Sequence, residues 1–360
     1  MEQKEEKTFG DIAPEYFGPL RYLLEEDSVT DIDFNGHQLW VTDCRNHRWE
    51  VRDHQMTRQF MEQFSQRLAN HAGRQFNRMN PLLETETGFL RISMIHESIA
   101  FSGRSICIRK SMPEVRIRPL DAVLEHYCSA SVMQLLANCI LTGANLIFCG
   151  EPGAGKTECA RFFSGFIPEN QRVITIEETP EWHYREGNPG KDCVELCVNE
   201  TFSYTQALRA SLRQNPNWIM LSEARGKEVK SLLECFSCGV HGLTTLHTDD
   251  TRNVPDRVLN MMESRVDADR MENDVYTFVD AAILLCRKGE RRFIDQICFF
   301  SRENGENIRR LVLFQGKRTG KTLPQDMLTR MRRAGIGDPW HCPCVESLMV
   351  KPENIQEEKG

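Results

Sequence analysis

The stretch from Gly150 to Thr157 holds the residues whose types and spacing best suit chemistry. It reads Gly-Glu-Pro-Gly-Ala-Gly-Lys-Thr, a glycine followed by four residues and then Gly-Lys-Thr. An apolar run enters this stretch and a helix-like run leaves it, which is the context that a phosphate-binding loop requires. Glycines let successive backbone N–H groups point toward phosphate oxygens. A nucleotide site is therefore predicted at Gly150, Glu151, Pro152, Gly153, Ala154, Gly155, Lys156, Thr157 and Glu158.

Two side chains of this loop carry specific expectations. Lys156 would reach the β- and γ-phosphates of ATP, and the Thr157 hydroxyl would ligate Mg²⁺. Hydrolysis also needs a carboxylate that holds or polarises the attacking water. Two apolar runs end in such acids, at Glu177 and at Glu223, and either acid could reach the metal through a water molecule. ATP and Mg²⁺ are therefore the expected cofactors.

Strand-like and helix-like runs alternate through most of the chain after residue 130. This alternation predicts a largely parallel, doubly wound sheet, which binds ligands at the carboxyl ends of its strands. The expected fold class is α/β, with a RecA-like P-loop ATPase domain at 130–345. A smaller α+β domain at 1–110 and a linker at 111–129 precede it, and 346–360 reads as a polar tail.

The composition is that of a soluble globular protein, with 40% apolar and 27% charged residues in 360. The first residues are charged, and no run approaches the roughly 18 apolar residues that span a bilayer. We expect a cytoplasmic protein that is peripheral at the inner face of the cell membrane through its partners. The net charge of −7 argues against whole-chain affinity for nucleic acid or anionic lipid.

The histidines and cysteines permit several interpretations. His241 and His247 flank Gly-Leu-Thr-Thr-Leu, and each could be structural or could sense the γ-phosphate. The 14 cysteines are expected to be reduced thiols in a leaderless chain. Cys235–Cys238 has CxxC spacing but lies in an apolar helical pattern, and His341–Cys344 could hold a metal. A metal other than Mg²⁺ stays open.

Four blocks in one order resemble the type II/type IV secretion ATPase superfamily, which includes pilus motors and the hub ATPases of conjugative and effector secretion. They are the P-loop at 150–157, an "Asp box" at Arg172–Glu181, a Walker B block from Leu208–Arg213 through Ser222–Gly226, and a "His box" at His241–His247. The runs Ser28–Gly36 and Gly103–Lys110 are also similar to family blocks. The chain looks most like the Tad/Flp pilus and conjugative branch, and residues from about Asp280 onward match least well.

The resemblance implies a homo-hexameric ring of two-domain subunits, with ATP bound between the two domains. It implies inner-membrane components of a pilus or secretion machine as partners, and it makes nucleic acid unlikely as a partner. Glu177 would position the attacking water as the Asp-box acid, and Glu223 would be the Walker B acid. The family's Asp box usually reads Ile-Glu-Asp, whereas this chain has Glu178 at the third position, so no role is implied for Glu178.

The resemblance also implies roles for four basic side chains. His247 would sense the γ-phosphate with support from His241, and Arg91 and Arg109 would approach the phosphates from the amino-terminal domain. The expected function is ATP hydrolysis coupled to domain movement in a ring that powers pilus assembly or type IV/type II-like secretion.

The sequence is also compatible with two other functions. A RecA-like nucleic-acid-dependent motor shares the P-loop, and the basic stretch 287–333 could follow a nucleic-acid backbone. The acidic net charge and the lack of interleaved aromatic residues count against it. A structural subunit that holds nucleotide without hydrolysis would not need Glu177, Glu223 or Arg109.

Overall fold

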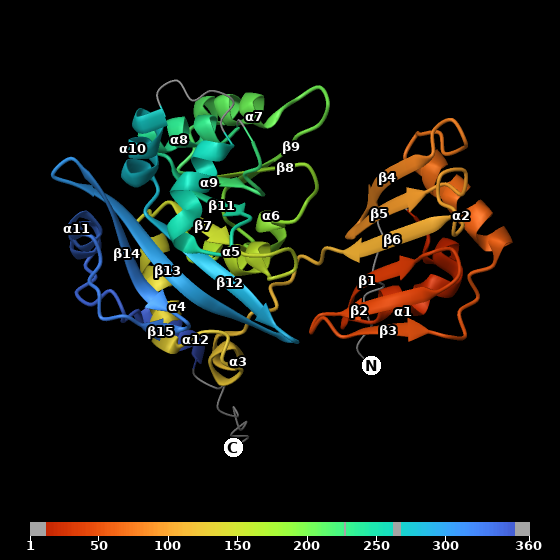
Figure 1. The fold of residues 1–360 in the computed structure, drawn as a ribbon, viewed down its shortest axis with the longest axis horizontal. Helices are drawn as coiled ribbons and strands as arrows, with labels where there is room; N and C mark the ends of the chain where they lie inside the picture. The colour runs from red at the N-terminus through yellow and green to blue at the C-terminus, as the bar shows by residue number, and fades with distance from the viewer. Residues whose placement is uncertain (1–11, 227, 262–267, 350–360) are drawn as a thin grey trace, which may run out of the picture. The chain divides into compact units, whose positions relative to one another are not determined.

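The chain divides into two compact units, Met1–Pro113 and Glu114–Gly360 (Figure 1). The computed structural model describes residues 12–226, 228–261 and 268–349. Each unit has a buried core of its own. In the described ranges, none of the helices is both long enough and apolar enough to cross a membrane.

The first unit is a six-stranded antiparallel sheet with the strand order β3-β2-β1-β6-β5-β4. Successive side chains of a strand point to opposite faces, and the buried set packs against the helices η1, α1 and α2. The elements are η1 Pro14–Leu20, α1 Arg21–Glu25, β1 Val29–Phe34, β2 Leu39–Asp43, β3 Arg48–Val51, α2 Arg58–His71, β4 Leu82–Thr87, β5 Leu90–Ile95 and β6 Ser105–Lys110.

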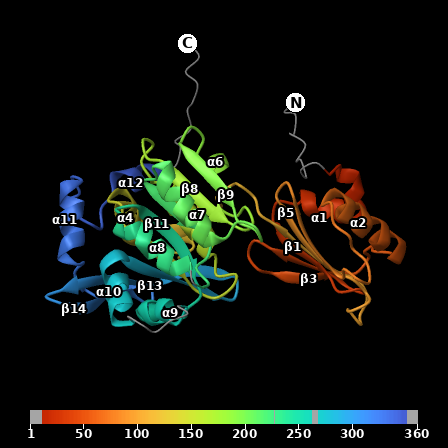
Figure 2. The same ribbon diagram turned by 90° about the horizontal axis from the view of Figure 1, so that it is seen from above.

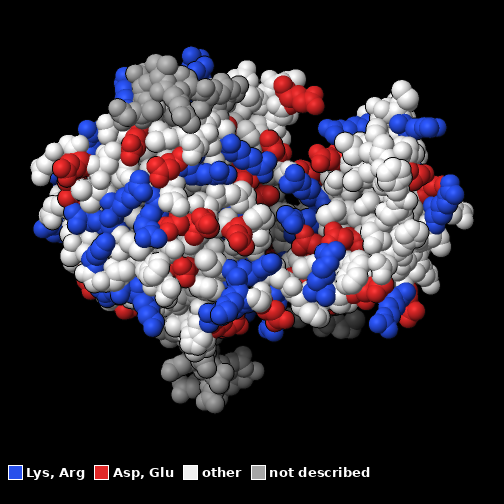
Figure 3. Space-filling model, in the orientation of Figure 1, with Lys and Arg blue, Asp and Glu red and all other residues white. Residues whose placement is uncertain are grey.

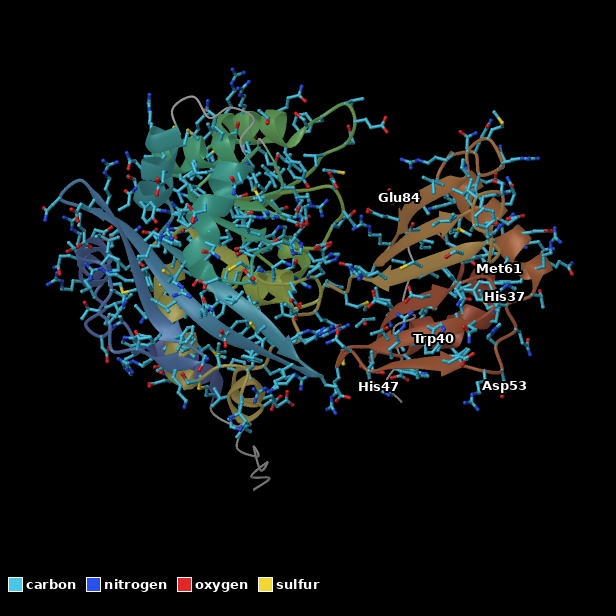
Figure 4. All side chains as sticks on the ribbon, in the orientation of Figure 1. His37, Trp40, His47, Asp53, Met61 and Glu84 are labelled. Carbon is cyan, nitrogen blue, oxygen red and sulfur yellow. The ribbon has the colours of Figure 1, made fainter. Side chains whose placement is uncertain are left out.

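The two faces of this sheet differ in chemistry. Met61 on α2 is buried in the core, whereas Trp40 on β2 and Glu84 on β4 belong to the opposite face (Figure 4). The guanidinium of Arg48 lies 5.6 Å from the centre of the Trp40 ring, as in a cation–π contact. The face away from the helices is therefore charged and amphipathic.

The second unit is built on a nine-stranded sheet with the order β15-β14-β13-β12-β7-β11-β10-β8-β9. The strands from β12 to β9 in this order run parallel, and β13 to β15 are antiparallel to their neighbours. The strands are β7 Leu146–Cys149, β8 Val173–Glu177, β9 Cys193–Cys197, β10 Trp218–Leu221, β11 His241–Leu246, β12 Ala281–Lys288, β13 Arg291–Glu303, β14 Glu306–Phe314 and β15 Lys317–Arg318.

Helices cover both faces of this sheet, which confirms the predicted doubly wound α/β fold (Figure 2). Along β7, Leu146 and Phe148 belong to one core, and Ile147 and Cys149 belong to the other. A strand buried on both faces is apolar throughout, as expected for a parallel sheet. The first core includes residues of α3, α4, α5, α11 and α12, and the second includes residues of α7, α8, α9 and α10.

The helices of the second unit connect consecutive strands or pack on the first core. They are α3 Pro119–Leu124, α4 Ala130–Leu141, α5 Lys156–Ser164, α6 Tyr184–Gly187, α7 Tyr204–Ser211, η2 Leu212–Gln214, α8 Glu228–Ser237, η3 Thr251–Asn253, α9 Val254–Asn260, α10 Ala268–Phe278, α11 Gln325–Arg333 and α12 Pro343–Met349.

The structure differs from the predicted linker and tail. Helix α3 lies inside the predicted linker 111–129, and its Ala122 is buried in the first core of the second unit. Proline at the first helical position favours helix initiation, so the prolines that suggested a linker also fit a helix start. Helix α12 extends into the predicted tail, and residues 350–360 of that tail lie outside the described residues.

A glycine-to-alanine pair tests the packing of the second unit. A Cβ on Gly242 would lie 2.3 Å from Phe236 Cε1 and 2.9 Å from the Ile219 carbonyl oxygen. We expect Gly242→Ala to lower the free energy of unfolding by about 1–3 kcal/mol, because the overpacked core must shift. Urea denaturation followed by tryptophan fluorescence measures this change.

Gly337→Ala is the matched control, because a Cβ there would have no heavy atom within 4 Å. Equal stability of the Gly242→Ala and Gly337→Ala chains would contradict the packing described for β11.

Candidate nucleotide-binding site

The loop between β7 and α5 has the geometry of a phosphate cradle. Gly150 has φ 145°, and a Cβ there would lie 2.3 Å from the Leu285 carbonyl oxygen on β12, so this position requires glycine. Gly155 adopts a left-handed conformation (φ 89°) as the N-cap of α5. Helix α5 therefore begins at Lys156 with its unpaired N–H groups facing the loop, an arrangement that favours anions.

Lys156 is a buried cation at the centre of the site. Its ammonium donates to the carbonyl oxygens of Gly150 (3.1 Å) and Glu151 (3.2 Å), and its Nζ lies 3.2 Å from Nδ1 of His247. Burial lowers the pKa of Lys156 from its ordinary value, and the nearby Glu223 carboxylate opposes this shift. The ammonium thus lies between the carboxyl ends of β7 and β11.

The predicted acid Glu223 and the predicted sensor His247 contact each other. Strands β10 and β11 are parallel neighbours, so the residues just after them meet at one edge of the sheet. Nε2 of His247 lies 2.9 Å from Oε1 of Glu223, and Nε of Arg225 donates to Oε2 of Glu223 at 2.8 Å. Nδ1 of His247 lies 3.2 Å from Nζ of Lys156 and 3.1 Å from the Gly150 carbonyl oxygen, so the ring bridges the P-loop and Glu223.

Glu177 is placed differently from the prediction. Its side chain is buried, and Oε2 accepts hydrogen bonds from the backbone N–H groups of Glu181 (2.8 Å) and Trp182 (3.0 Å). Burial raises the pKa of Glu177 to about 7, and the two backbone donors oppose this rise. Glu177 therefore anchors the loop that follows β8.

The carboxylate that this anchored loop brings to the P-loop is Glu181. The Thr157 hydroxyl donates to Oε2 of Glu181 at 3.4 Å. Glu181 is the last residue of the predicted Asp box Arg172–Glu181, for which the resemblance implies Glu177 as the water-positioning acid. Hydroxyl and carboxylate oxygens are the protein ligands that Mg²⁺ prefers, so Thr157 and Glu181 fit the implied metal. Its chemistry there would be to neutralise charge on the phosphates.

His241 lies at the other end of the strand from His247. Strand β11 starts at His241 and ends at Leu246, so the two histidines are about 20 Å apart at the usual rise per residue. The His241 ring packs on Trp218, with 5.3 Å between ring centres, and a Cβ on Gly143 would lie 2.5 Å from it. The expectation that His241 supports His247 is therefore wrong. The alternative, that His241 is a structural histidine, agrees with its packing on Trp218.

Arg91 and Arg109 lie side by side in the first unit. They are cross-strand partners on β5 and β6, and both are exposed. Nε of Arg109 donates to Oδ1 of Asp31 on β1 at 2.7 Å. The sheet thus presents two adjacent guanidinium groups, and their approach to a nucleotide stays a prediction.

Two arginines of the basic stretch 287–333 lie against the P-loop. Nε of Arg292 on β13 donates to the Gly153 carbonyl oxygen at 3.0 Å. Nη1 of Arg287 on β12 lies 3.6 Å from where a Cβ on Gly153 would be. On the other side of the loop, a cavity of about 430 Å³ opens between Gly150, His247 and α9.

The cysteine-rich segments form no metal centre in the described part of the chain, where no group of three or more His, Cys, Asp or Glu side chains is placed to hold a metal ion. In the His341–Cys344 segment, Nδ1 of His341 lies 3.1 Å from Oε1 of Glu346. The thiol of Cys342 is buried.

The buried Glu177 carboxyl makes stability depend on pH. The folded chain keeps this proton up to about pH 7, whereas a carboxyl at its ordinary pKa of 4.5 releases it earlier. The folded state thus binds more protons in this window, and its contribution to stability falls as pH rises through it. Relative to wild type, Glu177→Gln should gain roughly 3 kcal/mol of unfolding free energy across the window, because glutamine cannot ionise.

Urea denaturation at a series of pH values measures this gain, with Glu178→Gln, an exposed neighbour, as the control. A constant difference between Glu177→Gln and wild type at every pH would contradict the burial of Glu177.

Comparisons with known proteins agree with this geometry. The family model described as "Type II/IV secretion system protein" matches residues 59–321. An uncharacterized Bacillus anthracis protein is 27% identical over 262 residues, which are 72% of this chain and 59% of that protein. The chain therefore spans 59% of the length of this curated relative.

Solved structures show the same fold at low identity. The Legionella pneumophila ATPase DotB aligns with a TM-score of 0.59 and 15% identity, over 96% of this chain and 88% of DotB. The pilus retraction motor PilT with bound ADP aligns with a TM-score of 0.59 and 18% identity, over 92% of this chain and 88% of PilT. With the family model covering most of its length, this chain belongs to the type II/IV secretion system protein family.

Proposed function

We propose that this protein is a Mg²⁺-dependent ATPase whose hydrolysis drives domain movement in a homo-hexameric ring, and that the ring powers pilus assembly or type IV/type II-like secretion. The observation that carries the proposal is the continuous set of contacts from Lys156 through His247 to Glu223 beside the P-loop. Family membership supports the same class of activity, as does the likeness to the ATPase DotB and to the pilus retraction motor PilT.

The contacts of Lys156 give a physical route for nucleotide binding. The γ-phosphate of ATP would replace the carbonyl oxygens of Gly150 and Glu151 as acceptors for the ammonium. Charge-assisted hydrogen bonds to phosphate are stronger than those to carbonyl groups, so the exchange is favourable. His247 contacts both Lys156 and Glu223, so it would detect whether the terminal phosphate is present.

Two carboxylates would act on the attacking water or on the metal. Glu223 is held by His247 and Arg225, and its oxygens keep lone pairs that can accept from water. Glu181 accepts from the Thr157 hydroxyl and would have the role that the resemblance implies for Glu177. Glu177 is then a positioning residue, because it holds the loop that carries Glu181.

The proposal also covers the assembly of the subunits and the location of the ring. Arg91 and Arg109 would supply positive charge to the phosphates from the first unit, as the family resemblance implies. The ring would work with inner-membrane components at the cytoplasmic face of the cell membrane. A nucleic-acid motor is less well supported, because Arg309, Arg310 and Arg330 of the basic stretch form ion pairs within the unit.

Removal of the P-loop cation tests the nucleotide site. We expect Lys156→Ala to weaken ATP binding at least about tenfold, because a charge-assisted contact to phosphate is lost. Titration with a fluorescent ATP analogue measures the affinity. Lys191→Ala is the matched control, since Lys191 also donates to two backbone carbonyls, those of Gly165 and Ile167. Unchanged affinity in Lys156→Ala would refute the nucleotide site.

Neutralising the loop acids one at a time tests their roles. Glu181→Gln should reduce ATP turnover by about 10²-fold or more with nucleotide affinity retained, since general-base or water-orienting groups contribute on that scale. Glu177→Gln should lose less, because an amide oxygen can still accept from the Glu181 and Trp182 N–H groups.

Glu178→Gln is the control in that series, since Glu178 is exposed on the same loop. A larger loss in Glu177→Gln than in Glu181→Gln would return the water-positioning role to Glu177.

Light scattering with and without ATP tests the ring. We expect a species of six times the 41.6 kDa chain mass when nucleotide is present. A monomer under every nucleotide condition would contradict the ring while leaving the nucleotide site untouched.

A further inference from the structure

We propose that the tip of the β12–β13 hairpin is a binding subsite for the α-phosphate, ribose and base end of the nucleotide, with Arg292 and Arg287 as its ligands. The inference rests on the proposed function, because it names a further part of the same nucleotide site. The ligand class is a nucleoside di- or triphosphate, and the arginines belong to the same subunit as the P-loop.

The strand register places these arginines beside the loop. Strands β7 and β12 are parallel, with Leu284 opposite Cys149, so the residues after Leu284 run alongside the start of the P-loop. Arg287 and Arg292 are cross-strand partners in the β12–β13 hairpin, so their side chains share one face of the sheet. Leu285 and Ile294 on the same face belong to the core that includes α5 residues. The two guanidinium groups therefore lie on the α5 side of the sheet.

The hairpin makes close contacts with the P-loop at Gly153 and Gly155. Arg292 donates to the Gly153 carbonyl oxygen, and its Cδ lies 3.2 Å from where a Cβ on Gly155 would be. Nη1 of Arg287 lies 3.6 Å from where a Cβ on Gly153 would be. A Cβ at Gly155 would crowd Arg292, whereas a Cβ at Gly153 would be in ordinary van der Waals contact with Arg287. Lys288 and Arg291 are exposed nearby, and basic side chains gather over the end of the hairpin (Figure 3).

The direction of the bound triphosphate follows from the other contacts of the loop. Lys156 lies with His247 and Glu223 on the side of β7 that faces β11 and β10. The terminal phosphate would therefore lie on this side of the loop. Strand β12 borders β7 on the opposite side. A triphosphate that lies along the loop with its terminal phosphate at Lys156 therefore directs its α-phosphate toward the hairpin. A guanidinium group can pair with that phosphate through two donors and can also stack on a base.

This placement separates the hairpin arginines from catalysis. Contacts to the α-phosphate and base are the same in ATP, ADP and the transition state for cleavage of the γ-phosphate. Such uniform binding affects KM and leaves kcat unchanged. The subsite therefore sets affinity, whereas the groups around Lys156 act on the terminal phosphate.

The experiment compares Arg292→Ala, Arg287→Ala and Arg291→Ala in the full-length chain. Arg291 is the matched control, because it is exposed and its guanidinium lies over the Phe293 ring at 4.8 Å. We expect the Arg292 and Arg287 variants to bind a fluorescent ADP analogue and an ATP analogue about tenfold more weakly, with KM raised by a similar factor. Their kcat should stay within about twofold of wild type, and Arg291→Ala should match wild type throughout.

Competition by inorganic pyrophosphate distinguishes arginines that bind the nucleotide from arginines that only stabilise the loop. If they only stabilise the loop, their removal would weaken the binding of pyrophosphate as much as the binding of ADP. If they bind the α-phosphate, ribose and base, their removal should leave the affinity for pyrophosphate unchanged. Equal losses for both ligands, unchanged ADP affinity in both variants, or a fall in kcat at constant KM would each overturn the inference. Failure of the wild-type chain itself to bind ADP would instead refute the proposed function.

Discussion

The buried charge of Lys156 is the constraint on which the rest of the site depends. A cation removed from water must find hydrogen-bond acceptors, and an unpaired one is too costly to keep charged. Here the acceptors are the carbonyl groups of Gly150 and Glu151, and Nδ1 of His247 lies 3.2 Å from the ammonium nitrogen. They come from the ends of β7 and β11, so the position of the ammonium requires these strands to be parallel neighbours. The fold of the second unit thus determines where a phosphate can be gripped.

The same charge connects the loop to the acid on β10. Burial alone lowers the pKa of Lys156, and Glu223 raises it again, so the carboxylate helps to keep the lysine protonated. The imidazole lies between them, with Nδ1 3.2 Å from the ammonium and Nε2 2.9 Å from the carboxylate. A change in the acceptors of Lys156 therefore alters the hydrogen bonding of Glu223 without any movement of the strands. This is the simplest physical link between a terminal phosphate and a carboxylate that could act on water.

The parts of the site that follow from a local sequence pattern could be predicted. The parts that depend on how strands distant in the sequence pair with one another could not. Glycine spacing specifies the P-loop, and apolar runs that end in polar residues located His247 and Glu223 at one edge of the sheet. The role expected for His241 was wrong because the residues from His241 to Leu246 form one continuous strand. The two histidines are therefore separated by the whole length of β11. Arg292 reaches the loop only through the pairing of β7, β12 and β13, for which no local pattern gives a signal.

The two acids after β8 show how a loop can divide structural and chemical work. Moving Glu177 away would leave the backbone N–H groups of Glu181 and Trp182 without their acceptor, at about 1–3 kcal/mol for each buried donor. Glu181 contacts a neutral hydroxyl, that of Thr157, at the longer distance of 3.4 Å, so a water or a metal ion can displace that contact at lower cost. An acid held by two buried backbone donors is suited to fix a loop, whereas an acid that faces the P-loop hydroxyl is placed where a water or a metal ion would lie. This difference in placement is why we propose Glu181 for the chemistry at the phosphate.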